Sequence, residues 1–221
     1  MSEFQIKMEI KSPTLLGSGE GLGSIIDTDI VYDNYGLPYI PARRLKGLLR
    51  ESAIEVQEMF ILSGIRQLSS INVDFVFGRR GSIKGAPVSF RNLHLENYDK
   101  AVNWLEWAFK NLDNVISRDT VLDRFTEIRQ RTAINKEGTA EESSLRTIRV
   151  LKAGYIFQGN IHLEEDDQNI LSLLAFACAN LRHVGSNRTR GLGEVSCSLW
   201  QNQKNLTQSE IENLKEEVCR V

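Results

Sequence analysis

Cysteine and proline are scarce in this sequence, and long apolar runs are missing. Its 221 residues include 3 cysteines and 4 prolines, and no Cys-x-x-Cys pair occurs. This spacing suggests neither a disulfide framework nor a zinc site, so we expect the cysteines to be small apolar residues in a reducing cytosol. No apolar stretch approaches the roughly 18 residues that a membrane-spanning helix needs, and residues 1–4 do not resemble a signal peptide. We therefore expect a cytoplasmic protein without membrane contact.

A large excess of charge of one sign is also missing. Lys and Arg number 27 against 29 Asp and Glu, which leaves a formal net charge of −2. This balance excludes a generally basic, histone-like binder, although a neutral total can hide a basic face opposite an acidic one. With neither repeats nor a dividing linker, we predict one elaborated domain over residues 1–221, with an insertion at 64–92, an arm at 118–150 and a tail at 201–221.

Hydrophobic periodicity predicts an alternation of strands and helices. Strands are expected at residues 4–10, 25–31, 73–78, 88–95, 153–163 and 194–200. Amphipathic helices are expected at 42–62, 99–112 (with Trp104 and Trp107 in the core) and 169–184, and a weak one from Asn205, capped by Thr207 or Ser209. The polar segment 120–148 is interpreted as a long hairpin or arm.

The order strand, helix, strand, strand, helix, strand predicts the fold class. It is the split βαβ order of an α+β, ferredoxin-like (RRM-like) domain, elaborated by insertions. Such a domain has an antiparallel sheet with helices on one face, and its other face is free for a ligand.

A glycine- and arginine-rich loop at residues 182–193 is the most informative segment. Glycine exposes backbone N–H groups and arginine offers a planar fork, and both bind phosphate oxygens. The loop lacks the Gly-Lys-Ser/Thr ending of a Walker loop, and it precedes a strand, which excludes the dinucleotide fingerprint. It predicts phosphate binding, although solvated arginines on a plain connection would give the same pattern.

A second basic segment lies at the start of the first predicted helix. Cationic side chains in a first helical turn oppose the helix dipole. An anionic ligand docked on that turn would remove the conflict, because the free N–H groups and the cations would then act together. The alternative interpretation is an exposed basic turn. Three cations, Arg43, Arg44 and Lys46, lie at this helix start, and Arg50 follows further along the same segment.

Three segments, in this order, resemble the RAMP proteins of CRISPR systems. They are residues 17–50, which contain Ile25-Ile26-Asp27 and Leu45-Lys46-Gly47-Leu48-Leu49-Arg50; residues 124–157, which contain Thr132-Ala133 and Leu145-Arg146; and residues 185–193. More narrowly, they are similar to the repeated backbone subunit of type III effector complexes. One departure is Ala42-Arg43-Arg44, which stands where the family usually has Gly-Ser-Ser.

The resemblance implies partners and an assembly. They are a CRISPR guide RNA, a complementary single-stranded target RNA, copies of the chain or paralogous RAMP subunits in a filament, and other effector-complex subunits. It also implies a β-hairpin thumb that enters the guide–target duplex at regular intervals. Together with the basic segments, it predicts an RNA-binding set: Arg43, Arg44, Lys46, Arg50, Arg129, Arg131, Gly185, Arg188, Arg190, Gly191 and Gly193.

The resemblance also implies a catalytic aspartate. In cleaving members, an aspartate just after the first glycine-rich loop cuts the target RNA with a divalent metal ion. Asp27 matches that position, and Asp29 and Asp33 are close enough to be confused with it. A single carboxylate suits Mg²⁺, which takes most of its ligands from water and phosphate. Without the resemblance, a turn or cap role for Asp27 would be favoured.

Three other functions stay open. The chain could be a non-cleaving structural RNA-binding subunit of the same kind of complex. It could be a precursor-processing RAMP endoribonuclease, although such enzymes commonly use a histidine in the N-terminal half and none precedes His94 here. It could also be an unrelated ferredoxin-like enzyme or interaction module, which would retain no RNA.

Overall fold

A computed structural model describes residues 3–19, 26–65, 68, 71–79, 85–139, 141, 144–164 and 167–219. Most of the predicted first glycine-rich loop and residues 80–84 lie outside these ranges. The strands are β1 (Phe4–Ile10), β2 (Tyr39–Ile40), β3 (Val88–Phe90), β4 (Leu93–Leu95), β5 (Thr126–Arg131), β6 (Arg146–Leu151), β7 (Ile156–Leu163), β8 (Val195–Gln201) and β9 (Lys204–Asn205). The helices are α1 (Ala42–Leu62), α2 (Val73–Phe77), α3 (Tyr98–Asn111), α4 (Arg118–Phe125), α5 (Gln168–Asn180) and α6 (Leu206–Cys219), with a 3-10 turn η1 (Arg188–Arg190).

The main sheet is antiparallel and has the predicted ferredoxin-like order. Its strands run β2–β4–β7–β1–β8–β9, and β3 pairs with β7 beside β4. β1 lies between β7 and β8, the two strands that α5 connects. Along β1 every second side chain, from Phe4 to Ile10, is buried under the helices. This arrangement confirms the α+β, ferredoxin-like fold class.

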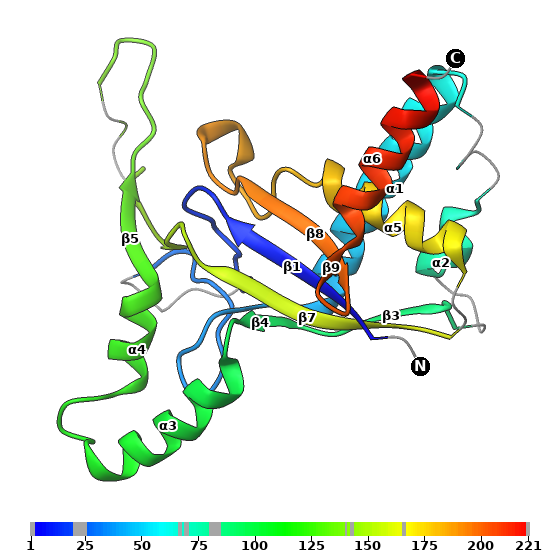
Figure 1. Cartoon of the computed structure of the whole chain (residues 1–221). Helices are drawn as coiled ribbons and strands as arrows, with labels where there is room; N and C mark the ends of the chain where they lie inside the picture. Colours follow the sequence, from blue (N-terminus) through cyan, green and yellow to red (C-terminus); the bar gives the residue numbers. More distant parts are fainter. Residues whose placement is uncertain are drawn as a thin grey trace.

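Three helices cover one face of this sheet (Figure 1). α1 occupies the predicted range, whereas α5 ends at Asn180 and not at Val184. The two helices pack together, and Ser52 Oγ donates a hydrogen bond to the Ala177 carbonyl, 2.8 Å away. α6 packs on α5 and β8. None of the described helices is long and apolar enough to span a membrane.

The predicted strand at 73–78 is wrong, because this segment forms the short helix α2. Its buried residues, Val73, Val76 and Phe77, have helical spacing, and Phe75 is exposed. Asn72 caps the helix by accepting a hydrogen bond from the Phe75 N–H, 3.1 Å away. A run of five apolar and polar residues is too short for periodicity to separate a strand from a helix.

The predicted strand at 88–95 is divided into β3 and β4. Phe90 lies opposite Ile161 and His94 opposite Gln158, so the register shifts by one residue between them, as in a β-bulge. A Cβ on Gly159 of β7 would lie 2.4 Å from the Asn92 carbonyl oxygen. Glycine at 159 therefore allows the bulge to approach β7.

The prediction that Trp104 and Trp107 belong to the core is also wrong. These side chains are 52% and 53% exposed, while Leu105 and Ala108 of the same helix are buried. α3 lies apart from the helical layer of α1, α5 and α6 (Figure 1), so only a narrow stripe of it is covered. In the tail, Asn205 caps α6 by accepting from the Gln208 N–H, and the predicted cap Thr207 is buried inside the helix.

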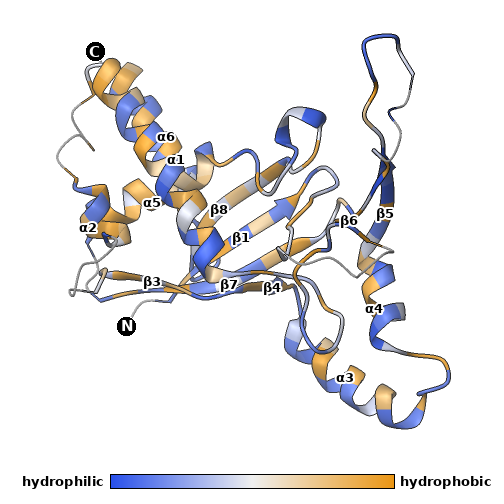
Figure 2. Ribbon diagram, turned by 180° about the vertical axis from the view of Figure 1, so that it is seen from behind, coloured by the Kyte–Doolittle hydropathy of each residue, from blue (hydrophilic) through white to orange (hydrophobic). Residues whose placement is uncertain are grey.

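Residues 118–151, called the arm below, comprise α4 and the hairpin of β5 and β6. The hairpin pairs from Thr126 opposite Leu151 to Arg131 opposite Arg146, and forms its own two-stranded sheet. It stands away from the main sheet (Figure 1), and β5 is largely hydrophilic (Figure 2). The predicted arm therefore exists, with a helix at its start that periodicity had not indicated.

Candidate functional site

A cleft of about 660 Å³ lies beside the hairpin of the arm, where β5 and β6 meet their connecting loop. Three segments far apart in the sequence form it: the residues after the first glycine-rich loop, the facing ends of β5 and β6, and the loop around η1. Its lining residues, called the arm-base cleft, are Leu15, Asp27, Thr28, Arg131, Thr132, Ala133, Ile134, Ser144, Arg146, Ile148, Asn187 and Arg190. The cleft therefore brings the predicted catalytic aspartate together with two of the predicted RNA-binding arginines.

Asp27 is held against strand β6. Its N–H donates to the Thr147 carbonyl at 2.8 Å, and the Thr147 N–H donates to Asp27 Oδ2 at 2.7 Å. Arg146 Nη1 lies 3.5 Å from Asp27 Oδ1. The Asp27 side chain is nevertheless 40% exposed. Its carboxylate is thus fixed in position and accessible from the cleft.

The segment that carries Asp27 does not form the strand predicted at 25–31. Isolated bridges join Thr28 to Ile148 and Gly17 to Ile30. Asp29 Oδ1 accepts a hydrogen bond from the Ile30 N–H at 2.8 Å, and Asp27 accepts from Thr147. Such side-chain hydrogen bonds to backbone groups compete with regular pairing.

The other two aspartates have structural contacts. Asp29 is buried, and its Oδ1 lies 3.2 Å from Arg149 Nε. Asp33 Oδ1 accepts hydrogen bonds from the Tyr35 and Leu37 N–H groups, and Oδ2 accepts from the Tyr98 hydroxyl at 2.7 Å. Of the three candidates, only Asp27 lines the arm-base cleft.

Three arginines surround Asp27 in the cleft: Arg131, Arg146 and Arg190. Three guanidinium groups against one carboxylate give the described part of the lining a formal charge of +2. Arg131 Nη1 is buried and has no hydrogen-bond partner among the described residues. Arg129, also predicted to bind RNA, instead donates to Glu127 Oε1 at 2.6 Å and is not part of the lining. The cleft therefore offers a cationic surface to an anion.

Arg146 and Asn187 are cleft residues that were not in the predicted RNA-binding set. Arg146 lies opposite Arg131 in the hairpin. The signal that could have found it is the pairing register, which the sequence alone does not give.

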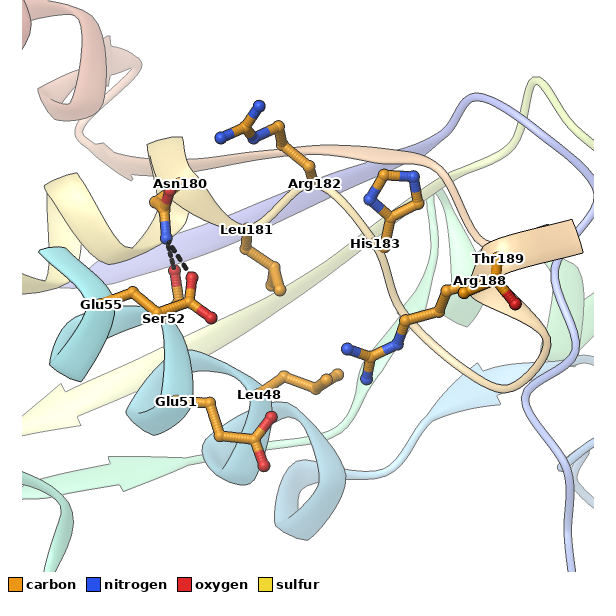
Figure 3. A pocket seen from close by; sticks show the side chains of 10 residues that line it. All are labelled: Leu48, Glu51, Ser52, Glu55, Asn180, Leu181, Arg182, His183, Arg188 and Thr189. Atoms are coloured by element: carbon orange, nitrogen blue, oxygen red, sulfur yellow. Dashed lines mark hydrogen bonds between the residues drawn. The ribbon is translucent and has the colours of Figure 1, made fainter. Parts of the chain in front are cut away.

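The η1 turn separates the two arginines of the C-terminal loop. Arg190 lines the arm-base cleft, but Arg188 lines a second pocket of about 380 Å³ between the loop and α1. There Arg188 faces Glu51 (Figure 3), and its Nε donates to the Gly185 carbonyl at 3.1 Å. The two arginines of the predicted RNA-binding set therefore line different pockets.

Two of the three loop glycines are required by close backbone approaches. A Cβ on Gly185 would lie 2.3 Å from the Leu15 carbonyl oxygen, and one on Gly193 would lie 2.0 Å from that of Val184. Both residues also have positive φ angles. Gly191 ends η1 with φ +74° and would meet nothing within 4 Å. Chain packing thus explains Gly185 and Gly193 without a ligand.

The basic residues at the start of α1 are divided between solvent and protein contacts. Arg43 is exposed, whereas Arg44 Nη2 donates to the Gly17 carbonyl at 2.7 Å. Arg44 therefore ties the helix start to the beginning of the glycine-rich loop.

The cations further along α1 face α2 and the loop after it. Arg50 Nη2 lies 2.6 Å from Asp74 Oδ1, and this hydrogen bond lowers the pKa of Asp74. Lys46 Nζ lies beside Gly78. Arg50 thus already has a carboxylate partner in the protein.

The side chains of the cleft fit a metal ion only if a bound RNA phosphate and water supply the remaining ligands. No group of three or more His, Cys, Asp or Glu side chains that could hold a metal occurs within the described ranges. Asp27 is the only carboxylate among the described residues of the cleft lining, with hydroxyls of Thr28, Thr132 and Ser144 nearby. Mg²⁺ commonly binds one or two carboxylates and completes its shell with phosphate and water. Asp27 could therefore hold it together with an RNA phosphate.

Comparison with known proteins identifies the family. The family model of the RAMP superfamily matches residues 7–196, a range that contains every residue of the arm-base cleft. The chain belongs to the RAMP superfamily. This confirms the family predicted from the glycine-rich and basic segments.

Solved structures of type III-B Cmr-beta have a similar fold to this RAMP protein. A cryo-EM structure of Cmr-beta bound to cognate target RNA contains a chain with 14% identity and a TM-score of 0.60, covering 90% of this chain and 97% of that one. An apo-state cryo-EM structure gives 15% identity and a TM-score of 0.63, covering 92% and 98%. Comparison with curated proteins gives no match.

Proposed function

We propose that this RAMP protein is a guide-RNA-binding backbone subunit of a type III CRISPR effector complex, and that it cleaves target RNA at Asp27. Membership of the superfamily and the similarity to Cmr-beta chains, one of them in a complex with target RNA, support the assembly. The observation that carries the cleavage is the position of Asp27, exposed in a cleft that three arginines also line, beside a projecting hairpin.

The geometry suits cleavage by the RNA's own 2′-hydroxyl. Arg131, Arg146 and Arg190 bind the phosphates on either side of a splayed nucleotide, so that the 2′-oxygen lies in line with the adjacent phosphorus. Asp27 accepts the 2′-hydroxyl proton as the new P–O bond forms and the P–O5′ bond breaks. The leaving 5′-oxygen takes a proton from water, so the products are a 2′,3′-cyclic phosphate and a 5′-hydroxyl. A Mg²⁺ ion bound by Asp27 and phosphate would stabilise the developing charge.

Substitution of Asp27 tests this proposal. Asp27→Asn keeps the acceptor for the Thr147 N–H but removes the charge and the base. In the reconstituted complex with guide RNA, we expect target cleavage to fall by at least about 10²-fold, with unchanged guide and target binding. Asp33→Asn is the control for loss of a carboxylate outside the cleft. Cleavage at the wild-type rate by Asp27→Asn would remove the nuclease role.

A non-cleaving structural subunit is the second candidate. The contacts of Asp27 with Thr147 and Arg146 support it, because they join the Asp27 segment to β6, which is what a purely structural aspartate would do. The same experiment separates the two candidates: a structural role predicts that Asp27→Asn changes assembly or stability and that the wild-type complex cuts no target.

Neighbouring copies of the chain are the proposed partners in the backbone. Two apolar patches support this assembly: Trp104, Trp107 and Val115 at α3, and Ile61, Leu62 and Val218 at the ends of α1 and α6. α3 and the ends of α1 and α6 that carry these residues lie at opposite ends of the molecule in both views (Figures 1 and 2). Contact between unlike patches joins copies head to tail, which gives an open filament.

A further inference from the structure

The residues next to Asp27 are attached to the arm by side chains as well as by the backbone. Arg149, on β6, donates its N–H to the Thr28 carbonyl at 3.0 Å. Its Nε lies 3.2 Å from Asp29 Oδ1. Arg149 therefore contacts both residues that follow Asp27, while Thr147 contacts Asp27 itself.

This attachment is buried. The Arg149 side chain is 9% exposed and that of Asp29 is 6% exposed. Asp29 Oδ2 and Arg149 Nε have no hydrogen-bond partner among the described residues, and Arg149 supplies the positive charge that faces buried Asp29. Because the pair is buried, water cannot solvate either charge if its partner is removed.

Arg149 also connects to the other part of the arm. Its Nη1 lies 3.0 Å from Asp123 Oδ1 on α4, and the Asp123 side chain is largely exposed. One guanidinium group thus joins α4, β6 and the residues after Asp27.

We propose that Arg149 is a positioning residue, which fixes Asp27 relative to the arm by holding Thr28 and Asp29. The proposal rests on the proposed cleavage function. Arg149 does not line the arm-base cleft, so it acts through the Asp27 segment and not on the RNA. A misplacement of a reacting group by about 1 Å can cost about 10²-fold in rate.

The test uses the reconstituted complex with guide RNA. The double variant Asp29→Asn/Arg149→Met removes both buried charges together, so that neither is left unpaired. We expect guide retention and target affinity within about twofold of wild type, and a single-turnover cleavage rate constant about 10²-fold lower. The single variant Arg149→Lys keeps the positive charge, so it should cleave faster than the double variant. Arg124→Met, an exposed arginine of α4, is the matched control and should cleave normally.

A second measurement does not depend on cleavage. The Thr147 and Arg149 N–H groups are hydrogen-bonded to Asp27 and Thr28, so their amide hydrogen exchange should be at least about tenfold faster in the double variant. If the double variant does not assemble, Asp29→Asn alone is used, with about tenfold slower cleavage expected.

The outcomes separate this proposal from the proposed function. The positioning role would be overturned if an assembled double variant cleaved at the wild-type rate or showed unchanged amide exchange. Cleavage at the wild-type rate by Asp29→Asn would overturn it as well. If Asp27→Asn cleaves at the wild-type rate, the proposed cleavage function is wrong. Amide exchange then decides by itself whether Arg149 holds the Asp27 segment.

Discussion

Asp27 and Asp29 are two residues apart in the chain but have different surroundings. Asp27 is open to the arm-base cleft, and Asp29 is buried against Arg149. Sequence alone could not separate them, because both have the composition of a turn and both follow the glycine-rich loop. The difference arises from β6, which is more than a hundred residues away and supplies the contacts of both.

The loop glycines give a prediction about stability. Gly193→Ala should lower the free energy of unfolding by more than about 2 kcal/mol, because a positive φ and a backbone clash with Val184 act together. Gly191→Ala meets open space and should cost only about 1 kcal/mol. Urea unfolding followed by circular dichroism measures both. Equal losses in the two variants would contradict the packing explanation for Gly193.

His94 gives a prediction about pH. Burial lowers the pKa of His94, against the opposing charges of Asp33 and Asp99, and the ring stacks between Tyr39 and Tyr98. The unfolded chain therefore binds more protons below about pH 6.5, so stability should fall as the pH falls from 7 to 5. His94→Phe should reduce this dependence in thermal melts across that range. A melting temperature that falls equally steeply in the variant would show that other groups are responsible.

At the scale of elements, periodicity predicted what packs on the main sheet. The buried faces of β1 and α1 repeat over many residues, so their pattern was clear. It failed at α2, which is too short to show a period, and at α3, whose Trp104 and Trp107 form an exposed stripe. Apolar spacing predicts a helical face but does not say whether another element covers it.

Single residues of the candidate site could be predicted from the sequence, but not which of them lie together in the fold. Asp27 came from the family resemblance, and Arg131 and Arg190 came from basic segments. Arg146 was missed, and the separation of Arg188 from Arg190 was not foreseen, because hairpin register and the direction of the η1 turn depend on tertiary contacts.

The separation of Arg188 from Arg190 predicts unequal effects on RNA binding. Arg190→Ala should weaken target binding and reduce the slope of log affinity against log salt by about 0.7, the value for one contact with a single strand. Arg188→Ala should change the slope less, because its side chain faces Glu51 and not the arm-base cleft. Filter binding at several salt concentrations measures both. The opposite order would place the RNA on the α1 side of η1.

At the scale of the whole molecule, the near-neutral composition hides an uneven distribution. Cations gather in the arm-base cleft, while apolar side chains are exposed at the two ends. The first arrangement suits a polyanion, and the second suits neighbouring subunits. The assignment of residues 1–221 to one domain stays a prediction.

The exposed tryptophans give a prediction about assembly. Trp104→Ser/Trp107→Ser should leave folding unchanged, because both side chains are about half exposed, but should shorten assemblies on guide RNA. Lys110→Ala, an exposed change on the same helix, is the control. Sedimentation velocity measures the size distribution. Assemblies of wild-type size would show that the α3 patch is not a subunit contact.

The central claim is that RNA is bound in the arm-base cleft, and photochemical cross-linking tests it most directly. The complex is assembled on 4-thiouridine-substituted guide and target RNA, irradiated, digested, and the cross-linked peptides are identified by mass spectrometry. The account predicts cross-links in the peptides that carry Asp27, Arg131, Arg146 and Arg190. Cross-links confined to the open face of the main sheet, on peptides of β1 and β7, would contradict it.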